Sequence, residues 1–310
     1  MRKVFTIGEI LLDIIFKNKK TVEAKPGGSM LNTAVSLGSL DMRVFMVGDC
    51  AKDSVGDLIT EFLKKDNVSV DYIKYHSEAN SKLALAFLDV DKNADYLFYK
   101  SEFKNRIKYI FPDVRKNDII LFGSFFSINK IIREQLIPFI KYAKSQEAII
   151  IYDPNFRSSH LNMLDDVIDF IIENIKLADI VKASDEDFKN IFNVRNPDDS
   201  SKIINSLSCK NLIYTSGENN VSVRTSNMNS DYEVPKIIPE STVGAGDTFS
   251  AGLICSLLKE NILFDDINKI SKMQWDRIIK TSIEFAQDVC MSFDNYISEK
   301  LAEKYRNNIE

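Results

Sequence analysis

The chain has few of the residues that mark secreted, metal-binding or membrane proteins. Its 310 residues include only four cysteines and two histidines, and no two cysteines are spaced as CxxC. We therefore expect no structural zinc site, and the lack of an N-terminal secretory signal favours a reducing, cytoplasmic setting. No apolar run approaches the length of a transmembrane helix, so we expect no association with a membrane.

The chain also lacks an excess of positive charge. It has 40 lysines and arginines against 45 acidic residues, a formal net charge of -5. Without a basic surplus to displace counterions, broad binding to a nucleic-acid backbone is not expected. The composition, 45% hydrophobic and 27% charged, is typical of a globular protein. We expect a single domain over residues 1–310 with a sizeable core.

Short apolar runs alternate along the chain with helical patterns. The runs that we predict to be strands are Val4–Ile7, Arg43–Val47, Ile119–Phe122, Ala148–Tyr152, Ile180–Val181 and Leu212–Tyr214. The predicted helices are Met30–Leu40, Val55–Lys64, Ile131–Ala143, Val167–Ile175, Phe188–Phe192, Thr248–Leu258, Trp275–Met291 and Ile297–Tyr305. Continuously apolar strands are typical of a parallel sheet that is covered on both faces. The alternation predicts a doubly wound α/β fold.

One region interrupts this alternation. From Ser69 to about Phe103 the sequence has strand signals with no helix between them. Leu83–Val90 and Asp95–Tyr99 flank a turn-like break at residues 91–94, which predicts a hairpin inserted into the α/β body. A small projecting sheet of this kind is suited to act as a lid or to pair with a second copy of the chain.

The segment from Ser241 to Phe249 contains Gly244-Ala245-Gly246-Asp247, directly before a predicted helix. Small residues let several backbone N–H groups point the same way, and with the helix dipole they form an anion site. Asp247 lies beside that site, where a carboxylate can take a proton from a hydroxyl group. A tight turn with a helix-capping aspartate is an equally good interpretation of the tetrapeptide alone.

A second glycine-containing segment runs from Lys25 to Ala34. Gly27 and Gly28 allow close approach to a ligand, Ser29 is a candidate helix cap, and Asn32 can present its amide to hydroxyl groups. Taken alone, a loop followed by a capped helix is the simpler interpretation of this segment.

Two charged side chains stand out near predicted strands. Asp13 interrupts the apolar run Ile10–Ile15, and burial of an acid is costly unless hydrogen bonds compensate; a sugar hydroxyl pair and a surface position both fit. Arg157 follows the strand Ala148–Tyr152, at an end where ligands bind in open α/β sheets. Its charge suits a phosphate or polarised hydroxyls, and a salt bridge within the loop fits equally well.

Two further strand ends carry polar residues. Lys182–Asp187 offers carboxylates for Mg²⁺, although it also has the pattern of a helix N-cap followed by acids. At the end of the next predicted strand, Thr215 and Gly217 are candidates for contact with a nucleotide phosphate.

Together these motifs resemble the ribokinase-like (PfkB) carbohydrate kinases, and among them the fructokinase-like branch. Gly27-Gly28-Ser29…Asn32…Ala34 is similar to the family's N-terminal signature, and Thr242–Phe249 to its C-terminal signature. The resemblance covers nearly the whole chain. It implies an αβα sandwich with a mostly parallel central sheet and a small β-sheet lid from approximately 10–26 and 69–105. The sugar would lie under the lid, with ATP in a neighbouring groove.

The resemblance also implies roles for individual residues. Asp247 would be the base that deprotonates the sugar, and the N–H groups around Gly244, Ala245 and Gly246 would hold the charge of the transferred phosphoryl group. The implied sugar-binding residues are Asp13, Gly27, Gly28, Asn32, Phe98 and Arg157. The implied residues of the nucleotide groove are Ser184, Thr215, Gly217 and Gln287, with Asp187 near the metal.

The chain departs from the family pattern at several places. Ser241 stands where the family often has an acid that helps to bind a monovalent cation, so potassium activation is not implied. Asp187 ends the segment that is usually Asn-x-x-Glu, and Asn220 replaces a glycine of the nucleotide segment. The run Phe285–Ile297 lacks the usual glycine, which implies an unusual adenine pocket.

The resemblance therefore implies an ATP- and Mg²⁺-dependent kinase that phosphorylates a primary hydroxyl of a small sugar, with a ketohexose such as fructose as first candidate. Alternative acceptors are 2-keto-3-deoxygluconate, ribose or a nucleoside, for which Phe98, Tyr99 and Phe103 would supply an aromatic slot. A catalytically weak relative that senses a sugar or binds a partner is a further alternative. Exposed strand edges of the lid, and family habit, favour a homodimer through the lid.

Overall fold

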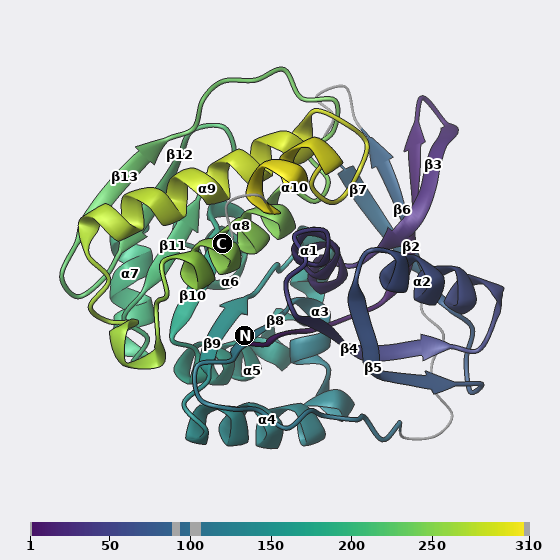
Figure 1. Cartoon of the computed structure of the whole chain (residues 1–310), viewed down its shortest axis with the longest axis horizontal. Coiled ribbons are helices and arrows are strands. Elements are labelled where there is room, and N and C mark those ends of the chain that lie inside the picture. Colours follow the sequence, from purple (N-terminus) through teal and green to yellow (C-terminus); the bar gives the residue numbers. More distant parts are fainter. Residues whose placement is uncertain (1, 89–93, 100–106, 307–310) are drawn as a thin grey trace.

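A nine-stranded sheet lies at the centre of the molecule (Figure 1). The computed structural model describes residues 2–88, 94–99 and 107–306. The strand order is β13-β12-β11-β10-β9-β8-β1-β4-β5, in which only β12 and β13 pair antiparallel to their neighbours. The strands are β1 (Val4–Ile7), β4 (Val44–Ala51), β5 (Val68–His76), β8 (Ile119–Gly123), β9 (Ile149–Asp153), β10 (Ile180–Ser184), β11 (Leu212–Thr215), β12 (Asn220–Arg224) and β13 (Asn229–Glu233).

Helices cover both faces of this sheet. One layer consists of α1 (Ser29–Gly38), α2 (Ser54–Lys65), α8 (Ala245–Lys259), α9 (Lys272–Cys290) and α10 (Glu299–Arg306). The other consists of α3 (Ser124–Ile128), α4 (Lys130–Ser145), α5 (Leu164–Leu177), α6 (Asp185–Phe192) and α7 (Pro197–Ser206). Short 3₁₀ turns lie at η1 (Ser158–Met163) and η2 (Phe264–Asp266). The predicted doubly wound α/β fold is confirmed.

The two layers explain why the strands are apolar throughout. In β8, Ile119 and Leu121 pack against the layer that contains α8, whereas Ile120 and Phe122 pack against the layer that contains α4. Successive side chains of a strand point to opposite faces, so both sets must be apolar when both faces are covered. The same argument accounts for the apolar character of α8, which lies between the sheet and α9.

A separate four-stranded sheet projects from one side of the body and forms the lid (Figure 1). Its order is β3-β2-β6-β7, and its strands are β2 (Leu11–Lys17), β3 (Lys20–Gly27), β6 (Lys82–Leu88) and β7 (Ala94–Tyr99). Strands β6 and β7 are antiparallel, as the predicted hairpin requires. Strand β5, however, pairs with β4 in the main sheet, so the second lid segment begins at Lys82 and not at residue 69. Most of the predicted turn at 91–94, and residues 100–105 including Phe103, lie outside the described residues.

Cys50, Cys209, Cys255 and Cys290 are all free and buried. Among the helices that the structure describes, none is both long enough and apolar enough to cross a membrane.

Candidate active site

A pocket opens where the lid, the start of α1 and the start of α8 meet. Its lining combines three carboxylates with one arginine, one histidine and two phenylalanines. The lining residues are Glu9, Leu11, Asp13, Gly28, Ser29, Met30, Asn32, Phe98, Ser124, Phe125, Asn155, Arg157, His160, Val243, Gly244 and Asp247. The structure thus brings together residues from both glycine-containing segments, the lid and the segment after β9.

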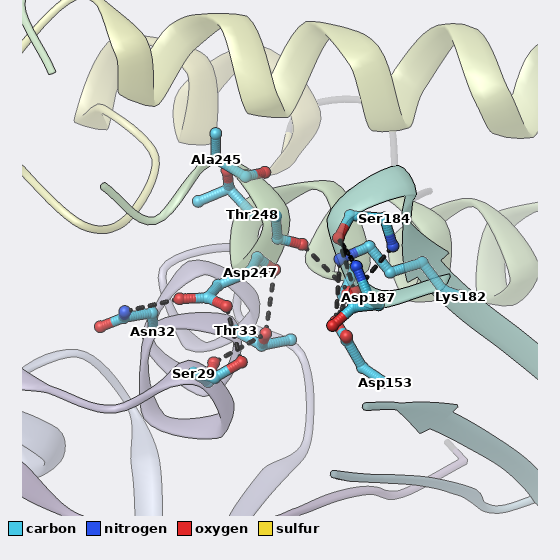
Figure 2. A network of polar contacts seen from close by, with 12 residues as sticks. Ser29, Asn32, Thr33, Asp153, Lys182, Ser184, Asp187, Ala245, Asp247 and Thr248 are labelled. Carbon is cyan, nitrogen blue, oxygen red and sulfur yellow. Dashed lines mark hydrogen bonds and ion pairs between the residues drawn. The ribbon is translucent and has the colours of Figure 1, made fainter. Parts of the chain in front are cut away.

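Asp247 lies in the first turn of α8 and is held by side chains of α1 (Figure 2). Ser29 Oγ donates to Asp247 Oδ1 at 2.6 Å, and Asn32 Nδ2 donates to Oδ2 at 2.8 Å. Thr33 Oγ1 donates to the Asp247 carbonyl oxygen at 2.9 Å. Each carboxylate oxygen has two lone-pair sites, so one internal donor leaves capacity for a hydroxyl group in the adjoining pocket.

The function of Ser29 differs from our prediction. The N-cap of α1 is Gly28, and it has no side-chain cap hydrogen bond. The serine hydroxyl instead reaches across to Asp247, which is 218 residues away in the sequence. Because no local pattern specifies a partner at that separation, only the packing of α1 against α8 decides between the two roles.

Gly244 begins α8 in a left-handed conformation, with φ at 81°. A Cβ atom there would lie 2.6 Å from the carbonyl oxygen of Asn295, so both the conformation and the space require glycine. Ala245 N donates to the Thr242 carbonyl at 3.3 Å, which tightens the turn. The first N–H groups of a helix lack intrahelical acceptors and lie at its positive end, so this turn has the properties of an anion site.

Asp13 is buried beside the pocket, with 5% of its surface exposed. Asn295 Nδ2 donates to Asp13 Oδ2 at 2.9 Å, and a Cβ atom on Gly27 would fall 1.9 Å from the same oxygen. Burial raises the pKa of Asp13 to about 7, and the neighbouring charge of Asp247 adds to the shift. The surface position that the sequence left open for Asp13 is therefore wrong. Asn295, which sequence analysis missed, carries no recognisable motif.

Two amide oxygens next to these carboxylates are available as acceptors. Among the described residues, neither Asn32 Oδ1 nor Asn295 Oδ1 has a hydrogen-bond partner, although both atoms are buried. Unpaired buried acceptors are rare in folded proteins, so these two oxygens, beside Asp13 and Asp247, are candidates to accept hydrogen bonds from a bound ligand.

A further part of the pocket lining comes from the lid and from the segment after β9. Phe98 of β7 stacks on His160 of η1, with ring centroids 5.9 Å apart. Arg157 lines the pocket, and its Nη1 lies 4.0 Å from Glu186 Oε2. Phe98 and Arg157 were predicted from the sequence, whereas His160, which lies only three residues beyond Arg157, was not.

A buried ion pair lies on the other side of the α8 turn (Figure 2). Lys182 Nζ is 2.9 Å from Asp153 Oδ2, and 3.1 Å from the point where a Cβ atom on Gly246 would lie. Burial lowers the pKa of Lys182, but the carboxylates of Asp153, Asp187 and Asp247 outweigh burial and the pKa is raised. The cation therefore offsets negative charge directly beneath the candidate anion site.

Ser184 and Asp187 form a capping box at the start of α6. Asp187 Oδ2 accepts from Ser184 N and Oγ, each at 2.7 Å, and Oδ1 accepts from Phe156 N at 2.5 Å. Both oxygens are thus used inside the protein, and direct coordination of a metal would compete with these bonds. The N-cap interpretation of this segment is confirmed, whereas the metal role of Asp187 stays a prediction.

The residues predicted for the nucleotide groove do not all lie together. Ser184 and Thr215 are register partners at the ends of β10 and β11. Gly217 follows with φ at 53°, and a Cβ atom there would meet nothing within 4 Å. Gln287 instead donates from Nε2 to the Pro235 carbonyl at 2.6 Å and lines a different hollow, between β13 and α9. Its adenine-side role stays a prediction.

A lidded α/β body with a carboxylate at a helix start defines a class of sugar phosphotransferases. The family model described as pfkB family carbohydrate kinase matches residues 1–288. The chain belongs to this family and is a carbohydrate kinase.

Similar proteins include the Arabidopsis thaliana protein named "Probable fructokinase-5", which is 25% identical over 285 residues and 87% of each chain. Aminoimidazole riboside kinase from Salmonella typhimurium is 21% identical, over 84% of this chain and 82% of its own.

Solved structures confirm the ribokinase-like fold. Fructokinase from Vibrio cholerae O395, in its fructose-, ADP- and calcium-bound form, matches with a TM-score of 0.86 and 18% identity, over 98% of this chain and 99% of its own. Aminoimidazole riboside kinase from Salmonella enterica, complexed with aminoimidazole riboside and an ATP analogue, matches with a TM-score of 0.83 and 17% identity over the whole of both chains.

Proposed function

We propose that this protein transfers the γ-phosphoryl group of ATP to a primary hydroxyl of a small sugar, with a ketohexose such as fructose as first candidate. The observation that carries the proposal is the position of Asp247 in the first turn of α8, at the positive end of that helix, where it lines the pocket. The family, and fructokinases among the similar proteins, support the same reaction.

In the proposed reaction Asp247 accepts the proton of the sugar hydroxyl as that oxygen attacks the γ-phosphorus. The bond from the γ-phosphorus to the bridging oxygen breaks, and ADP leaves with the bonding electrons. Negative charge that develops on the transferred group meets the N–H groups of Gly244, Ala245 and Gly246 at the helix start. Ala245 N would have to share its proton with the Thr242 carbonyl, to which it donates at 3.3 Å. Ser29 and Asn32 orient the base, because each donates to one of its oxygens.

The charge of the pocket supports an uncharged acceptor. Among the described lining residues, Glu9 and Asp247 contribute two carboxylates against one arginine, Arg157. Asp13 adds a third carboxyl group that is only partly ionised at neutral pH, because its pKa is about 7. An anionic acceptor such as 2-keto-3-deoxygluconate or a sugar phosphate would meet this negative field, whereas a neutral polyol offers hydroxyl donors to it. Asp13, Gly27, Gly28 and Asn32 are proposed to bind those hydroxyls, and Phe98 to cover them.

ATP and Mg²⁺ are proposed as co-substrate and cofactor. Neighbouring structures contain ATP, or ADP with potassium or calcium. The structure describes no group of three side chains that could hold a metal ion, and Mg²⁺ needs none here because phosphates and water supply most of its ligands. Bound Mg²⁺ would neutralise phosphate charge, with Asp187 nearby and the nucleotide along Ser184, Thr215 and Gly217.

The test is Asp247→Asn, assayed by ADP release with ATP–Mg²⁺ and a panel of fructose, ribose, 2-keto-3-deoxygluconate and inosine. A general base contributes about 10²–10⁴ in rate, so we expect kcat on the preferred sugar to fall by at least about 10² with an unchanged Tm. Asp169→Asn, at an exposed position of α5, is the matched control and keeps the wild-type rate. Turnover by Asp247→Asn at the wild-type rate contradicts the proposal. Sugar binding by the wild-type protein without ADP release would favour the sugar-sensing alternative.

A homodimer through the lid is also proposed. The lid exposes apolar side chains at Val22, Phe87, Leu97 and Tyr99. Apolar groups gathered on one small sheet, with strand edges beside them, favour pairing with a second copy. Light scattering at working concentration tests this, and a monomer contradicts it. A cytoplasmic location stays a prediction.

A further inference from the structure

We propose that His160 determines acceptor specificity by filling the aromatic slot in which the planar base of a riboside would stack, so that the kinase accepts a free monosaccharide. This inference rests on the proposed function and deepens it. It decides between the two kinds of acceptor represented among the similar proteins, fructose and an aminoimidazole riboside.

Within the part of the chain that the structure describes, the imidazole ring of His160 lies close to the rings of Phe98, Phe125 and Phe156. Its centroid is 5.9 Å from that of Phe98 with an interplanar angle of 24°, and 5.3 Å from that of Phe125 at 36°. Phe156 contributes a third ring at 6.0 Å and 55°. Centroid distances of 4.5–7 Å are the usual range for interacting aromatic rings. The imidazole therefore already occupies the stacking position against the lid's phenylalanine.

This aromatic group belongs to the acceptor pocket itself. Phe98, Phe125 and His160 line the same pocket as Asp13 and Asp247. A sugar whose primary hydroxyl faces Asp247 extends its other end away from that carboxylate, toward the remaining walls of the pocket. A free ketohexose ends in hydroxyl groups there, whereas a riboside carries a flat base that needs an aromatic face.

A riboside's base would have to displace His160 from Phe98 before it could stack. The stacking of the base on Phe98 would replace the stacking of His160 on Phe98, so no ring contact is gained overall. Displacement of His160 would also disturb its contacts with Phe125 and Phe156. A monosaccharide makes no such demand and leaves the stack intact. The side chain thus excludes one class of acceptor by occupying its place, which is a common route to specificity.

A purely structural role for His160 predicts lower stability on substitution but no change in acceptor preference. The decisive measurement is therefore the ratio of kcat/KM for inosine to that for fructose, both with ATP–Mg²⁺. The variants are His160→Ala, which empties the slot, and His160→Phe, which keeps an aromatic ring in it. Leu161→Ala, at the exposed neighbouring position, is the control.

We expect the wild-type ratio to lie well below one and to rise at least about tenfold in His160→Ala, mainly through a lower KM for inosine. His160→Phe and Leu161→Ala keep the wild-type ratio. If His160→Ala is unstable at the assay temperature, His160→Gln removes the ring while keeping most of the volume and gives the same comparison.

An unchanged ratio in a folded His160→Ala, or a wild-type enzyme that uses inosine as well as fructose, overturns the inference while leaving the kinase proposal intact. If the wild-type protein phosphorylates no acceptor of the panel, the proposed function fails instead. Calorimetric titration with inosine then still tests the slot: binding gained by His160→Ala over wild type supports it, and equal binding overturns it.

Discussion

Two buried lysine–aspartate pairs lie in different parts of the molecule. They differ in how many hydrogen bonds and ion pairs the carboxylate oxygens of the aspartate make. Asp49 lies in β4 of the main sheet and Lys82 is the first residue of the lid strand β6, so this pair joins the two sheets at the base of the lid. Asp153 and Lys182 lie beside the start of α8. Both aspartates are almost fully buried, and the shortest distances from Nζ to a carboxylate oxygen are 3.0 and 2.9 Å.

In the pair at the base of the lid, both carboxylate oxygens of Asp49 have polar partners. Asp49 Oδ1 accepts from Lys82 at 3.1 Å and from the Tyr109 hydroxyl at 2.9 Å, and His76 Nε2 lies 3.4 Å from Oδ2. Burial alone would raise the pKa of Asp49, but Lys82 and these hydrogen bonds outweigh it and lower the pKa to about 2. The Asp49 carboxylate of β4 therefore contacts side chains from β5, from β6 and from the segment after the lid.

The pair beside α8 is only partly satisfied. Asp153 Oδ1 is buried and, within the described residues, has no hydrogen-bond partner. Burial raises the pKa of Asp153 to about 6, and Lys182 only partly opposes the shift. Incomplete satisfaction and a perturbed pKa concentrate at functional sites, because ligands complete the network there. From the unpaired oxygen of Asp153 we predict that the second pair affects activity, whereas the first pair maintains the architecture.

The largest expected difference between the pairs is in stability. Lys82→Met leaves the buried Asp49 without its lysine partner, so we expect it to lower the free energy of unfolding by about 3–5 kcal/mol. Urea denaturation at pH 7 measures the loss. Replacing an exposed cation, in Arg277→Met, removes the pair with Glu260 and serves as the control with the smallest change. Equal losses in the two variants would contradict the structural role of Lys82.

Lys182→Met should cost less stability than Lys82→Met and more activity. Asp153, with a pKa of about 6, can take up a proton when its partner is removed, which limits the loss to about 1–3 kcal/mol. Removal of the cation beneath Gly246 leaves less positive charge near the transferred phosphoryl group, so kcat should fall. Lys182→Arg, which keeps the charge, should restore more of kcat than of stability. If Lys182→Met keeps the wild-type kcat, this pair is structural like the other.

The smallest expected effect is in the pH dependence of stability. The pKa of Asp49 is depressed, so its contribution is complete above about pH 4 and is lost as the pH falls toward 2. The pKa of Asp153 is raised, so its contribution is complete below about pH 4 and is lost as the pH rises toward 6. Asp153→Asn should therefore flatten the decline in unfolding free energy between pH 4 and 6. The pKa of Asp13 is also raised, and because this variant keeps Asp13, part of the decline in unfolding free energy should remain.

Denaturation of Asp49→Asn over the same range is the comparison for this prediction. Between pH 4 and 6 it should change the slope of the profile less than Asp153→Asn does, because the depressed pKa of Asp49 places most of its titration below that range. A profile of Asp153→Asn that parallels wild type between pH 4 and 6 would contradict the raised pKa.

Much of the fold followed from local pattern. The predicted boundaries of the strands near Ile119 and Ile149 differ by at most one residue from those of β8 and β9. Burial on both faces makes such strands continuously hydrophobic, and a continuous apolar run is easy to recognise in a sequence. Strands β12 and β13 were missed, since each carries polar residues on at least one face and resembles a loop. Strand β5 was assigned to the lid region, because strand signals do not say which sheet a strand joins.

The glycines and Asp247 were recognisable from the chain alone, because a left-handed turn before a helix and a carboxylate in its first turn depend on neighbouring residues only. The partners of these groups were not. Ser29 reaches Asp247, Asn295 reaches Asp13, and His160 stacks under a strand of the lid, across separations for which no pattern exists. Local backbone conformation depends mainly on adjacent residues and can therefore be predicted from the sequence. Hydrogen bonds and ring contacts between distant segments form only when the helices and the lid pack together.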